Sequence, residues 1–204
     1  NLSGANSTTG ATASVSITSG TGTMTIPAGS LTATGTQTIA VTDIENAATN
    51  CAQTGLALGD SFEVNPLPNT TGTAVAVADI CLGDNATATL TAGMLADGMY
   101  DITYDLDAPN AATGLTTSVI LVAGTGTFTI PAADLTTADA AQTVTITDIT
   151  DGNACNMTSL TIANDFAINT LPDPSTTGIA VADVCVNEDA TVTVTAGGLL
   201  DGNY

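Results

Sequence analysis

The chain has 204 residues and a formal net charge of −20, because it contains 20 acidic residues and no Lys, Arg or His. Without cations it cannot neutralise phosphates, which excludes nucleic acid and anionic membrane surfaces as partners. The missing His and Lys also remove the usual catalytic triads and Schiff-base chemistry, so we expect no enzymatic activity. Yet 44% of the residues are apolar, too many for a disordered chain, and no apolar run is long enough to span a membrane.

Strands are predicted along the whole chain, because apolar and polar residues alternate with a period of two. Thr fills most outward positions, where a β-branched polar residue suits a pleated surface. Turn signals recur about every 8 to 12 residues, a spacing typical of a β-sandwich. In chain order, the positions predicted to face inward are Met24 and Ile26, Ala88 and Leu90, Phe128 and Ile130, Val144 and Ile146, and Val192 and Val194.

The sequence also repeats itself at a spacing of 104 residues. "GTGTMTIPAG" begins at position 20 and "GTGTFTIPAA" at position 124, and Cys51 and Cys81 recur as Cys155 and Cys185. In part of the first copy the spacing slips to 105 and then returns. A period near 100 residues is the size of one small domain. With about seven strands per period, the expected fold is all-β, with tandem immunoglobulin-like β-sandwich domains repeating about every 104 residues.

Two proline-rich segments, Asn65–Thr73 and Asn169–Gly178, are predicted to link the domains, because proline cannot donate to a sheet and stiffens a junction. On this phase, residues 1–68 are the C-terminal part of a first repeat. Residues 69–172 form one complete repeat, and 173–204 are the N-terminal part of a third. The chain begins and stops inside a repeat, so we interpret it as a window on a longer polypeptide.

The acidic residues have two interpretations. Oxygen ligands in loops suit a hard cation such as calcium. If the sandwich topology holds, Asp84 lies at the same end of the complete domain as Asp105 and Asp107, next to a domain junction. These three residues are therefore the candidate calcium ligands. The alternative is that they are solvated carboxylates in turns.

Two stretches, "VNPLP…VADICLGDNATATLTAG" and "TDITDGNAC", carry a resemblance that covers essentially the whole chain. They resemble the immunoglobulin-like repeats of very large surface proteins of Bacteroidota. In those repeats a strand ends in Cys before a polar turn, a Thr-rich strand follows, and a "D-x-x-G/N-x-C" turn comes near the end. The resemblance implies type 9 secretion, extracellular display at the cell surface, and a mechanical or adhesive role, as in gliding adhesins and other surface fibres.

Four cysteines allow three disulfide pairings, and the sequence alone does not choose among them. One alternative is a Cys81–Cys155 bridge inside the complete domain. Another joins Cys51 to Cys81 and Cys155 to Cys185, and a third leaves free, buried thiols. The family resemblance favours Cys81–Cys155 as a structural disulfide, which is consistent with an oxidising extracellular location.

The expected function is that of a structural stalk in a long secreted surface fibre, with copies of the chain self-associating into a multichain filament. The nearly uncharged Thr faces leave lateral association open, because no Lys guards the exposed strands. The alternative is an adhesive module that contacts a cell surface or glycan. Sugar binding calls for exposed aromatic residues, and the chain has only three Tyr and three Phe, most of them on strand patterns. A cell-surface target would then be bound through domains outside this segment.

Overall fold

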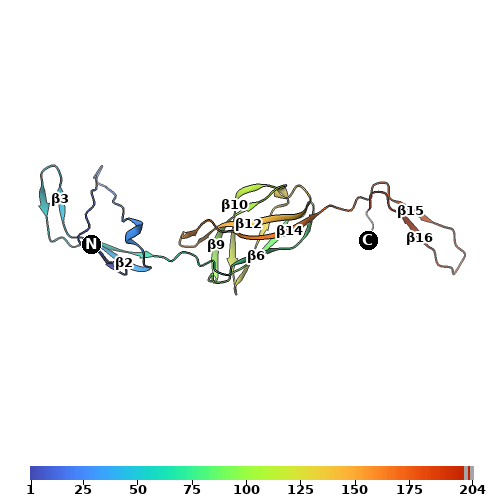
Figure 1. Ribbon diagram of the computed structural model, residues 1–204, viewed down its shortest axis with the longest axis horizontal. Helices are drawn as coiled ribbons and strands as arrows, with labels where there is room; N and C mark the ends of the chain where they lie inside the picture. Colours follow the sequence, from blue (N-terminus) through green and yellow to red (C-terminus); the bar gives the residue numbers. More distant parts are fainter. Residues whose placement is uncertain (200–201, 203–204) are drawn as a thin grey trace. The chain divides into compact units, whose positions relative to one another are not determined.

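The computed structural model describes residues 1–199 and residue 202, so residues 200, 201, 203 and 204 of the predicted third segment lie outside the described part. Its regular structure is β-strand apart from two single-turn 3-10 helices, η1 (Ala28–Ser30) and η2 (Ala132–Asp134). The predicted all-β class is therefore confirmed. The chain divides into two units: the first contains Asn1–Pro68 together with the short segment Asn153–Cys155, and the second begins at Asn69 (Figure 1).

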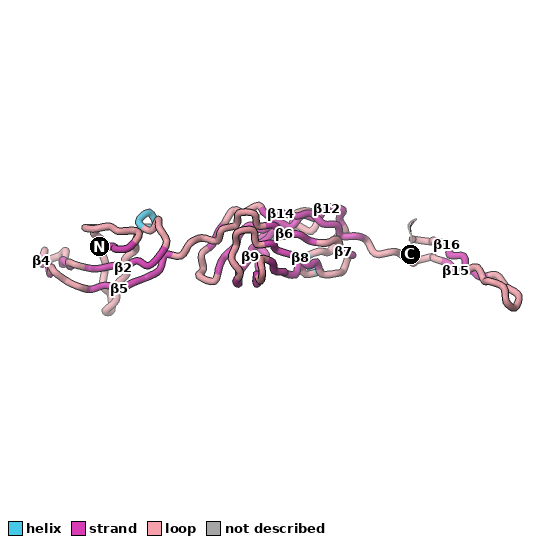
Figure 2. The backbone as a smooth tube through the Cα atoms, turned by 90° about the horizontal axis from the view of Figure 1, so that it is seen from below, coloured by secondary structure: helices cyan, strands magenta, loops and turns pink. Residues whose placement is uncertain are grey.

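A central domain in the second unit contains two sheets. The smaller sheet places β8 (Ala86–Thr91) between β6 (Ala74–Val77) and β11 (Thr125–Ile130), all antiparallel. In Figure 2, β12 and β14 run along one side of this domain and β8 along the other. The larger sheet has the order β10 (Ala112–Leu121), β9 (Gly98–Leu106), β12 (Asp139–Asp151), β14 (Ile162–Asn169) and β7 (Ile80–Cys81), with β13 (Asn156–Met157) paired to β12.

The first strand of this domain contributes to both sheets. Its front part, β6, pairs with β8, and its continuation, β7, runs parallel to β14. Between the two, the Asp79 carboxylate accepts a hydrogen bond from the Ala167 N–H at 2.8 Å. The Asn164 side-chain oxygen also accepts one from the Val77 N–H at 2.8 Å. These bonds hold the strand where it passes from one sheet to the other.

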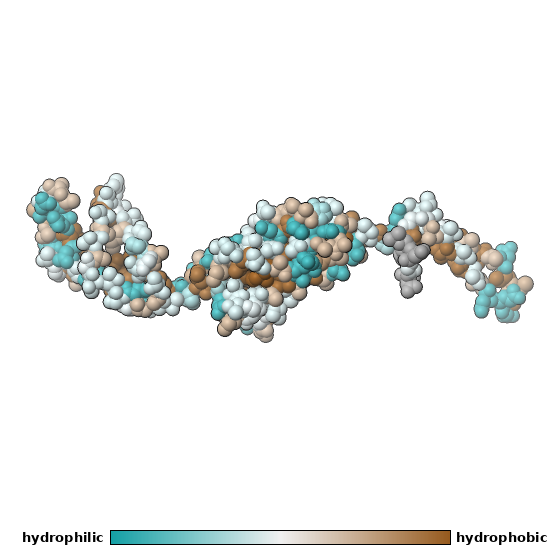
Figure 3. Space-filling model, in the orientation of Figure 1, coloured by the Kyte–Doolittle hydropathy of each residue, from teal (hydrophilic) through white to brown (hydrophobic). Residues whose placement is uncertain are grey.

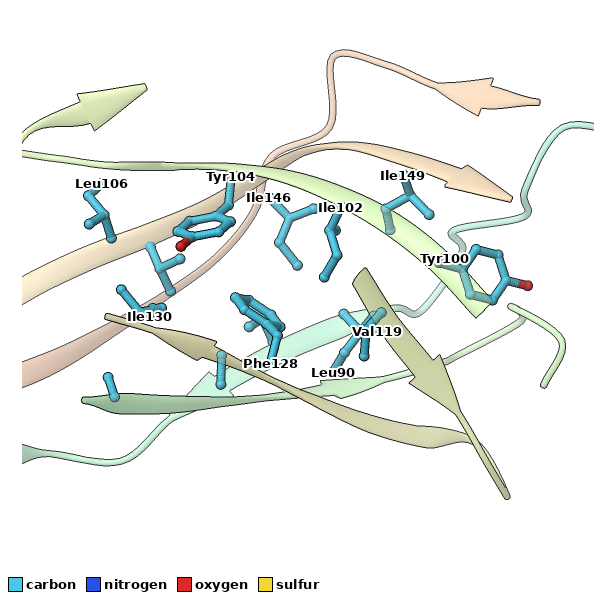
Figure 4. Packing of buried hydrophobic residues seen from close by; sticks show 14 of the residues in the cluster. Leu90, Tyr100, Ile102, Tyr104, Leu106, Val119, Phe128, Ile130, Ile146 and Ile149 are labelled. Atoms are coloured by element: carbon cyan, nitrogen blue, oxygen red, sulfur yellow. The ribbon is translucent and has the colours of Figure 1, made fainter. Parts of the chain in front are cut away.

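One hydrophobic core lies between the two sheets. In Figure 4, Ile102 and Ile146 point from the larger sheet toward Leu90 and Phe128 on the smaller one. The rings of Tyr104 and Phe128 lie 5.4 Å apart between centroids. The inward positions predicted for this domain are confirmed, each being at most 4% exposed: Ala88, Leu90, Phe128, Ile130, Val144 and Ile146.

The β10–β11 hairpin shows how local sequence sets the strand register. Val122 and Thr125 pair across a two-residue turn, and Ala123 (φ 51°) and Gly124 (φ 78°) both have positive φ. This is the type I′ geometry that matches strand twist, and glycine supports it. The Asp97 carboxylate accepts hydrogen bonds from both turn N–H groups, at 2.8 and 2.9 Å. The segment from Val122 to Thr125 is therefore a closed hairpin turn.

The first unit has one three-stranded sheet, with β2 (Gly35–Val41) between β1 (Leu2–Gly4) and β5 (Leu58–Val64). A separate hairpin joins β3 (Ile44–Asn46) to β4 (Cys51–Gln53). The strand predicted around Met24 and Ile26 is not formed. Its counterpart in the central domain, β11, exists by pairing with β8. The described residues of the first unit include no counterpart of β8, so this segment has no strand to pair with.

The last described strands, β15 (Gly178–Val181) and β16 (Val192–Thr195), form an antiparallel hairpin. Val192 and Val194 lie on a strand, as predicted, and Ile179 and Val181 face them across the hairpin. Their side chains are nevertheless more than half exposed, so the predicted inward face is present but uncovered.

Ile146 lies fully buried in the middle of β12, so the central domain should depend on it. We expect Ile146→Ala to lower the free energy of unfolding by about 3 kcal/mol, because a cavity replaces buried methylene groups. Urea unfolding followed by tyrosine fluorescence measures this, since Tyr100 and Tyr104 both lie in the core. The matched control Thr87→Ala, on the exposed face of β8, should cost less than about 1 kcal/mol. Equal losses in the two variants would contradict the core assignment.

Candidate functional site

The predicted calcium ligand Asp107 belongs to a polar network that joins the end of β9 to the start of β12. Its Oδ1 accepts hydrogen bonds from Gln142 Nε2 at 2.7 Å and from the Thr143 N–H at 2.8 Å. Gln142 is fully buried, and its Oε1 accepts a bond from Asn110 Nδ2 at 2.8 Å. Asn110 bonds both backbone groups of Thr137, at 2.8 and 2.9 Å. The Asp107 carboxylate therefore accepts hydrogen bonds from the side chain of the buried Gln142 and from a backbone N–H at the start of β12.

The other two predicted ligands lie apart from this network. Asp105 Oδ1 accepts a hydrogen bond from the Gly114 N–H at 2.8 Å and so holds the start of β10. Asp84 lies in the exposed turn between β7 and β8. Among residues 1–199 and 202, no three carboxylate or thiol side chains are grouped so that they could hold a metal ion. The structure thus does not gather Asp84, Asp105 and Asp107 into one site.

The same buried amide pair recurs in the first unit. Asn6 and Gln37 stand 104 and 105 positions before Asn110 and Gln142, and all four are at most 7% exposed. Gln37 Oε1 accepts a hydrogen bond from the Asn6 N–H at 3.1 Å, and Asn6 Nδ2 donates to the Ala33 carbonyl at 2.6 Å. Sequence reasoning missed these residues. The available signal was that Gln37 and Gln142 occupy inward positions of the strand alternation.

Gln142 should be a critical polar residue of the central core. We expect Gln142→Ala to lower the free energy of unfolding by roughly 2–3 kcal/mol, because Asn110 and Asp107 would lose their buried partner. Urea unfolding of the two proteins measures the difference. Thr103→Ala, on the outward face of β9, is the control and should cost less than about 1 kcal/mol. If Gln142→Ala lowered the free energy of unfolding by less than about 1 kcal/mol, water would be replacing the hydrogen bonds of the network without cost.

The predicted disulfide is not present. No disulfide joins cysteines within the described residues, and the thiols of Cys51, Cys81 and Cys185 are free and exposed. Cys81 pairs with Asn169 at one end of β14, whereas Cys155 follows the far end of the antiparallel strand β12. Most of β12 separates them, roughly 30 Å at about 3.3 Å per residue. A disulfide requires Cα atoms about 4–7 Å apart, so the Cys81–Cys155 prediction is wrong for this fold.

Burial shapes the ionisation of two core tyrosines. It raises the pKa of Tyr104, and the negative charge of Asp134 adds to this increase. Burial likewise raises the pKa of Tyr100, with a further contribution from the charge of Asp151. The Tyr100 hydroxyl donates a hydrogen bond to the Ala96 carbonyl at 3.0 Å. The core therefore favours the neutral form of both side chains.

Because the folded-state pKa of Tyr104 is raised, its contribution to stability is fully present below the unfolded pKa of about 10. It is lost as the pH rises above that value toward the folded pKa. We expect the chain to lose unfolding free energy above about pH 10, and Tyr104→Phe to lose less while keeping the ring beside Phe128. Urea unfolding at about pH 8 and pH 11 measures both. Equal alkaline losses in the two proteins would contradict this prediction.

The first unit carries an apolar groove of about 720 Å³. Leu2 in this groove is buried, whereas Met24 and Ile44 are about half exposed, at 45% and 53%. The apolar groove is defined by Leu2, Met24, Ile26, Ile39, Val41 and Ile44. Their counterparts by repeat position are all core residues at most 4% exposed: Leu106, Phe128, Ile130, Val144, Ile146 and Ile149. The groove is thus a core face without its cover.

The β15–β16 hairpin carries a second uncovered surface, which we call the hairpin face. It consists of Ile179, Val181, Val192 and Val194, which are 53–73% exposed. Figure 3 shows apolar surface along this hairpin. The counterparts of three of these residues are buried in the central domain: Val75, Ala88 and Leu90. The sequence therefore places core residues on a surface.

No family model matches the chain, and a search of the curated proteins found no match. No helix among the described residues is long and apolar enough to cross a membrane.

Proposed function

We propose that the chain is a non-enzymatic structural stalk segment of a long, secreted cell-surface fibre. The observation that carries the proposal is the recurrence of one set of strands along the chain. The sheet order β1–β2–β5 repeats β9–β12–β14, and the hairpin β15–β16 repeats β6–β8. Proline-rich segments separate the copies. A series of one domain type on stiff linkers supplies length, which is what a stalk needs.

The strand arrangement supports an immunoglobulin-like domain with a period of about 104 residues. The order β6–β8–β11 corresponds to strands A, B and E of such sandwiches, and β10–β9–β12–β14 to C′, C, F and G. The parallel pairing of β7 with β14 accounts for the division of the first strand between the sheets. We therefore propose residues 69–172 as the complete domain, with the proline-rich segments as its linkers.

The loops support a mechanical role over an adhesive one. Asp97, Asp105 and Asp107 each accept hydrogen bonds from backbone N–H groups, so their carboxylates stiffen turns. No Phe or Tyr among the described residues is exposed, since Phe62 is half-buried and the others are buried. A glycan-binding surface needs exposed aromatic rings for stacking. Adhesion to a cell surface or glycan through the loops remains the second candidate function.

The resemblance to Bacteroidota surface repeats supports a location outside the cell, reached by type 9 secretion. We also propose that copies of this chain assemble into a multichain filament. The high negative charge keeps such chains soluble, while the threonine faces leave lateral packing open. Calcium binding by the exposed turn carboxylates stays a prediction from the sequence.

Pulling on a single assembled fibre tests the stalk. We expect a sawtooth in which each unfolding domain of about 100 residues releases roughly 30 nm of chain, because about 3.3–3.6 Å per residue becomes available. The control is a fibre unfolded in urea, which should extend smoothly. Smooth extension of the native fibre would contradict the proposal that folded domains are joined in series.

Electron microscopy of the native, unreduced particle tests the filament. We expect ordered multichain fibres with an axial repeat of one domain length, roughly 40 Å for a sandwich of this strand length. The same grids prepared with a calcium chelator show whether the order depends on calcium. Isolated flexible threads under both conditions would count against a filament.

A further inference from the structure

The two sides of the central domain differ in charge. On one side the first strand passes from β6 to β7 and pairs with β14, and Asp79 and Asp165 are exposed there. On the other side lie β10 and β11, the edge strands of the larger and the smaller sheet (Figure 1). Residues 108–133 contain both of these strands and no acidic residue. Two copies of the chain therefore repel each other least along this side.

The strand β10 is a long edge without the usual protection against pairing. Among the described strands it pairs along its length only with β9. Exposed edges in natural proteins are commonly guarded by a charged residue, a proline or a bulge. The register of β10 shifts between Ala112 and Leu115, but it is continuous from Leu115 to Leu121, where the strand has no charge and no proline. Such an edge accepts a further strand.

The hairpin turn shows which backbone groups of β10 face outward. Val122 and Thr125 exchange two backbone hydrogen bonds, at 2.8 and 3.2 Å, so the backbone groups of Val122 face away from β9. Backbone groups of alternate residues in a strand face the same side. Those of Ile120, Ser118 and Thr116 therefore also face away from β9.

Only part of this row is open to a partner. The Ile120 carbonyl lies close to β11, because a Cβ added to Gly126 would stand 2.5 Å from its oxygen. Thr116 and Ser118 are further along β10, and both are exposed. The open hydrogen-bonding groups of this edge are thus the N–H and C=O of Thr116 and Ser118.

We propose that β10 of one chain pairs antiparallel with β10 of a second copy of this chain, about a two-fold axis at Thr117. Thr116 of each chain then stands opposite Ser118 of the other, and each of these pairs exchanges two backbone hydrogen bonds. The larger sheets of the two domains become one continuous sheet. This inference deepens the proposed function and rests on it, because it names the lateral contact between copies of the stalk.

The sequence favours a second copy as the occupant of the edge. A two-fold contact requires a self-complementary surface, and the Thr116–Ser118 edge meets this requirement. Thr12 and Ser14 stand 104 positions earlier, within residues 1–42, which also contain no acidic residue. The edge pattern therefore recurs with the period of the repeat. A second copy carries the same pattern at the same spacing, so contacts that are weak singly add up along two fibres.

Charge permits this contact. The nearest acidic residue is Asp101 on β9, which pairs with Ser118 and accepts a hydrogen bond from its hydroxyl. In the paired copies the two Asp101 residues are at least three strand spacings apart, roughly 14 Å. This distance exceeds the Debye length of about 8 Å at physiological ionic strength. Association should therefore tighten only modestly as salt is added.

The first test is sedimentation of the 204-residue chain over a range of concentrations. We expect a monomer–dimer equilibrium for the wild-type chain and no detectable dimer for Ser118→Pro, because proline removes the outward N–H. An edge strand tolerates proline where its N–H faces solvent, so the domain should stay folded. Ser118→Ala is the matched control: it loses the same hydroxyl but keeps the backbone donor, and it should change association no more than a few-fold.

Tyrosine fluorescence of the central domain should be unchanged in Ser118→Pro and Ser118→Ala, which excludes a general folding defect. Dimers of Ser118→Pro as abundant as those of the wild-type chain would overturn the proposal. A wild-type chain that stays monomeric at its highest soluble concentration would overturn it as well.

The second test is a cross-link that does not depend on a proline. In a background with the four native cysteines changed to Ser, a mixture of Thr116→Cys and Ser118→Cys chains in molecular oxygen should give a covalent dimer on non-reducing gels. Residues directly opposite in such a pair have Cα atoms about 5.5 Å apart, within the range of a disulfide. Two thiols form the S–S bond, and oxygen takes up the two electrons and two protons.

Each cysteine variant alone is a control for the register. Identical residues of the two copies then stand on a diagonal, about 7–8 Å apart, which is too far for a disulfide. A mixture of Ser118→Cys with Thr87→Cys, on the exposed face of β8, should also give no dimer. A dimer of Ser118→Cys alone as abundant as that of the mixture would overturn the proposed pairing.

The outcomes separate this inference from the proposed function. A mixture of Thr116→Cys and Ser118→Cys that gives no dimer would overturn the contact but leave the stalk standing. Native fibres in which Ser118→Cys cross-links only to a different protein would also overturn the contact. Smooth extension of the fibre under force would instead overturn the stalk, whatever joins its copies.

Discussion

The structure depends on one constraint: an apolar sheet face must be covered by a second sheet. The central domain meets it with its own strands, and every inward residue of β8, β11 and β12 is buried as a result. Where the partner strands are absent from a unit, the same sequence pattern gives a groove or an uncovered hairpin. Strand formation follows the same rule, since residues 125–130 form β11 beside β8 while residues 22–26 stay irregular.

A chain without side-chain cations must pair its carboxylates with other hydrogen-bond donors. Here carboxylates accept hydrogen bonds from backbone N–H groups, as Asp97 does in the β10–β11 turn. Buried amides bond to each other and to the backbone, as Asn110 does with Gln142. Hydrogen bonds to charged groups are stronger than neutral ones, so this use of aspartate gives tight turns without ion pairs. The acidic composition is therefore compatible with a rigid domain.

The sequence predicted the parts of the fold that alternation and repetition determine. Ala88, Leu90, Val144 and Ile146 are buried because a period of two places them on one face, and that information is local. The sequence could not show that the segment around Met24 fails to form a strand, because a strand depends on a partner far away in the sequence. The prediction of a Cys81–Cys155 disulfide was wrong because the spacing of cysteines in the sequence does not show which end of a sheet each one occupies. The burial of Gln37 and Gln142 could have been predicted, because both residues occupy inward positions of the strand alternation.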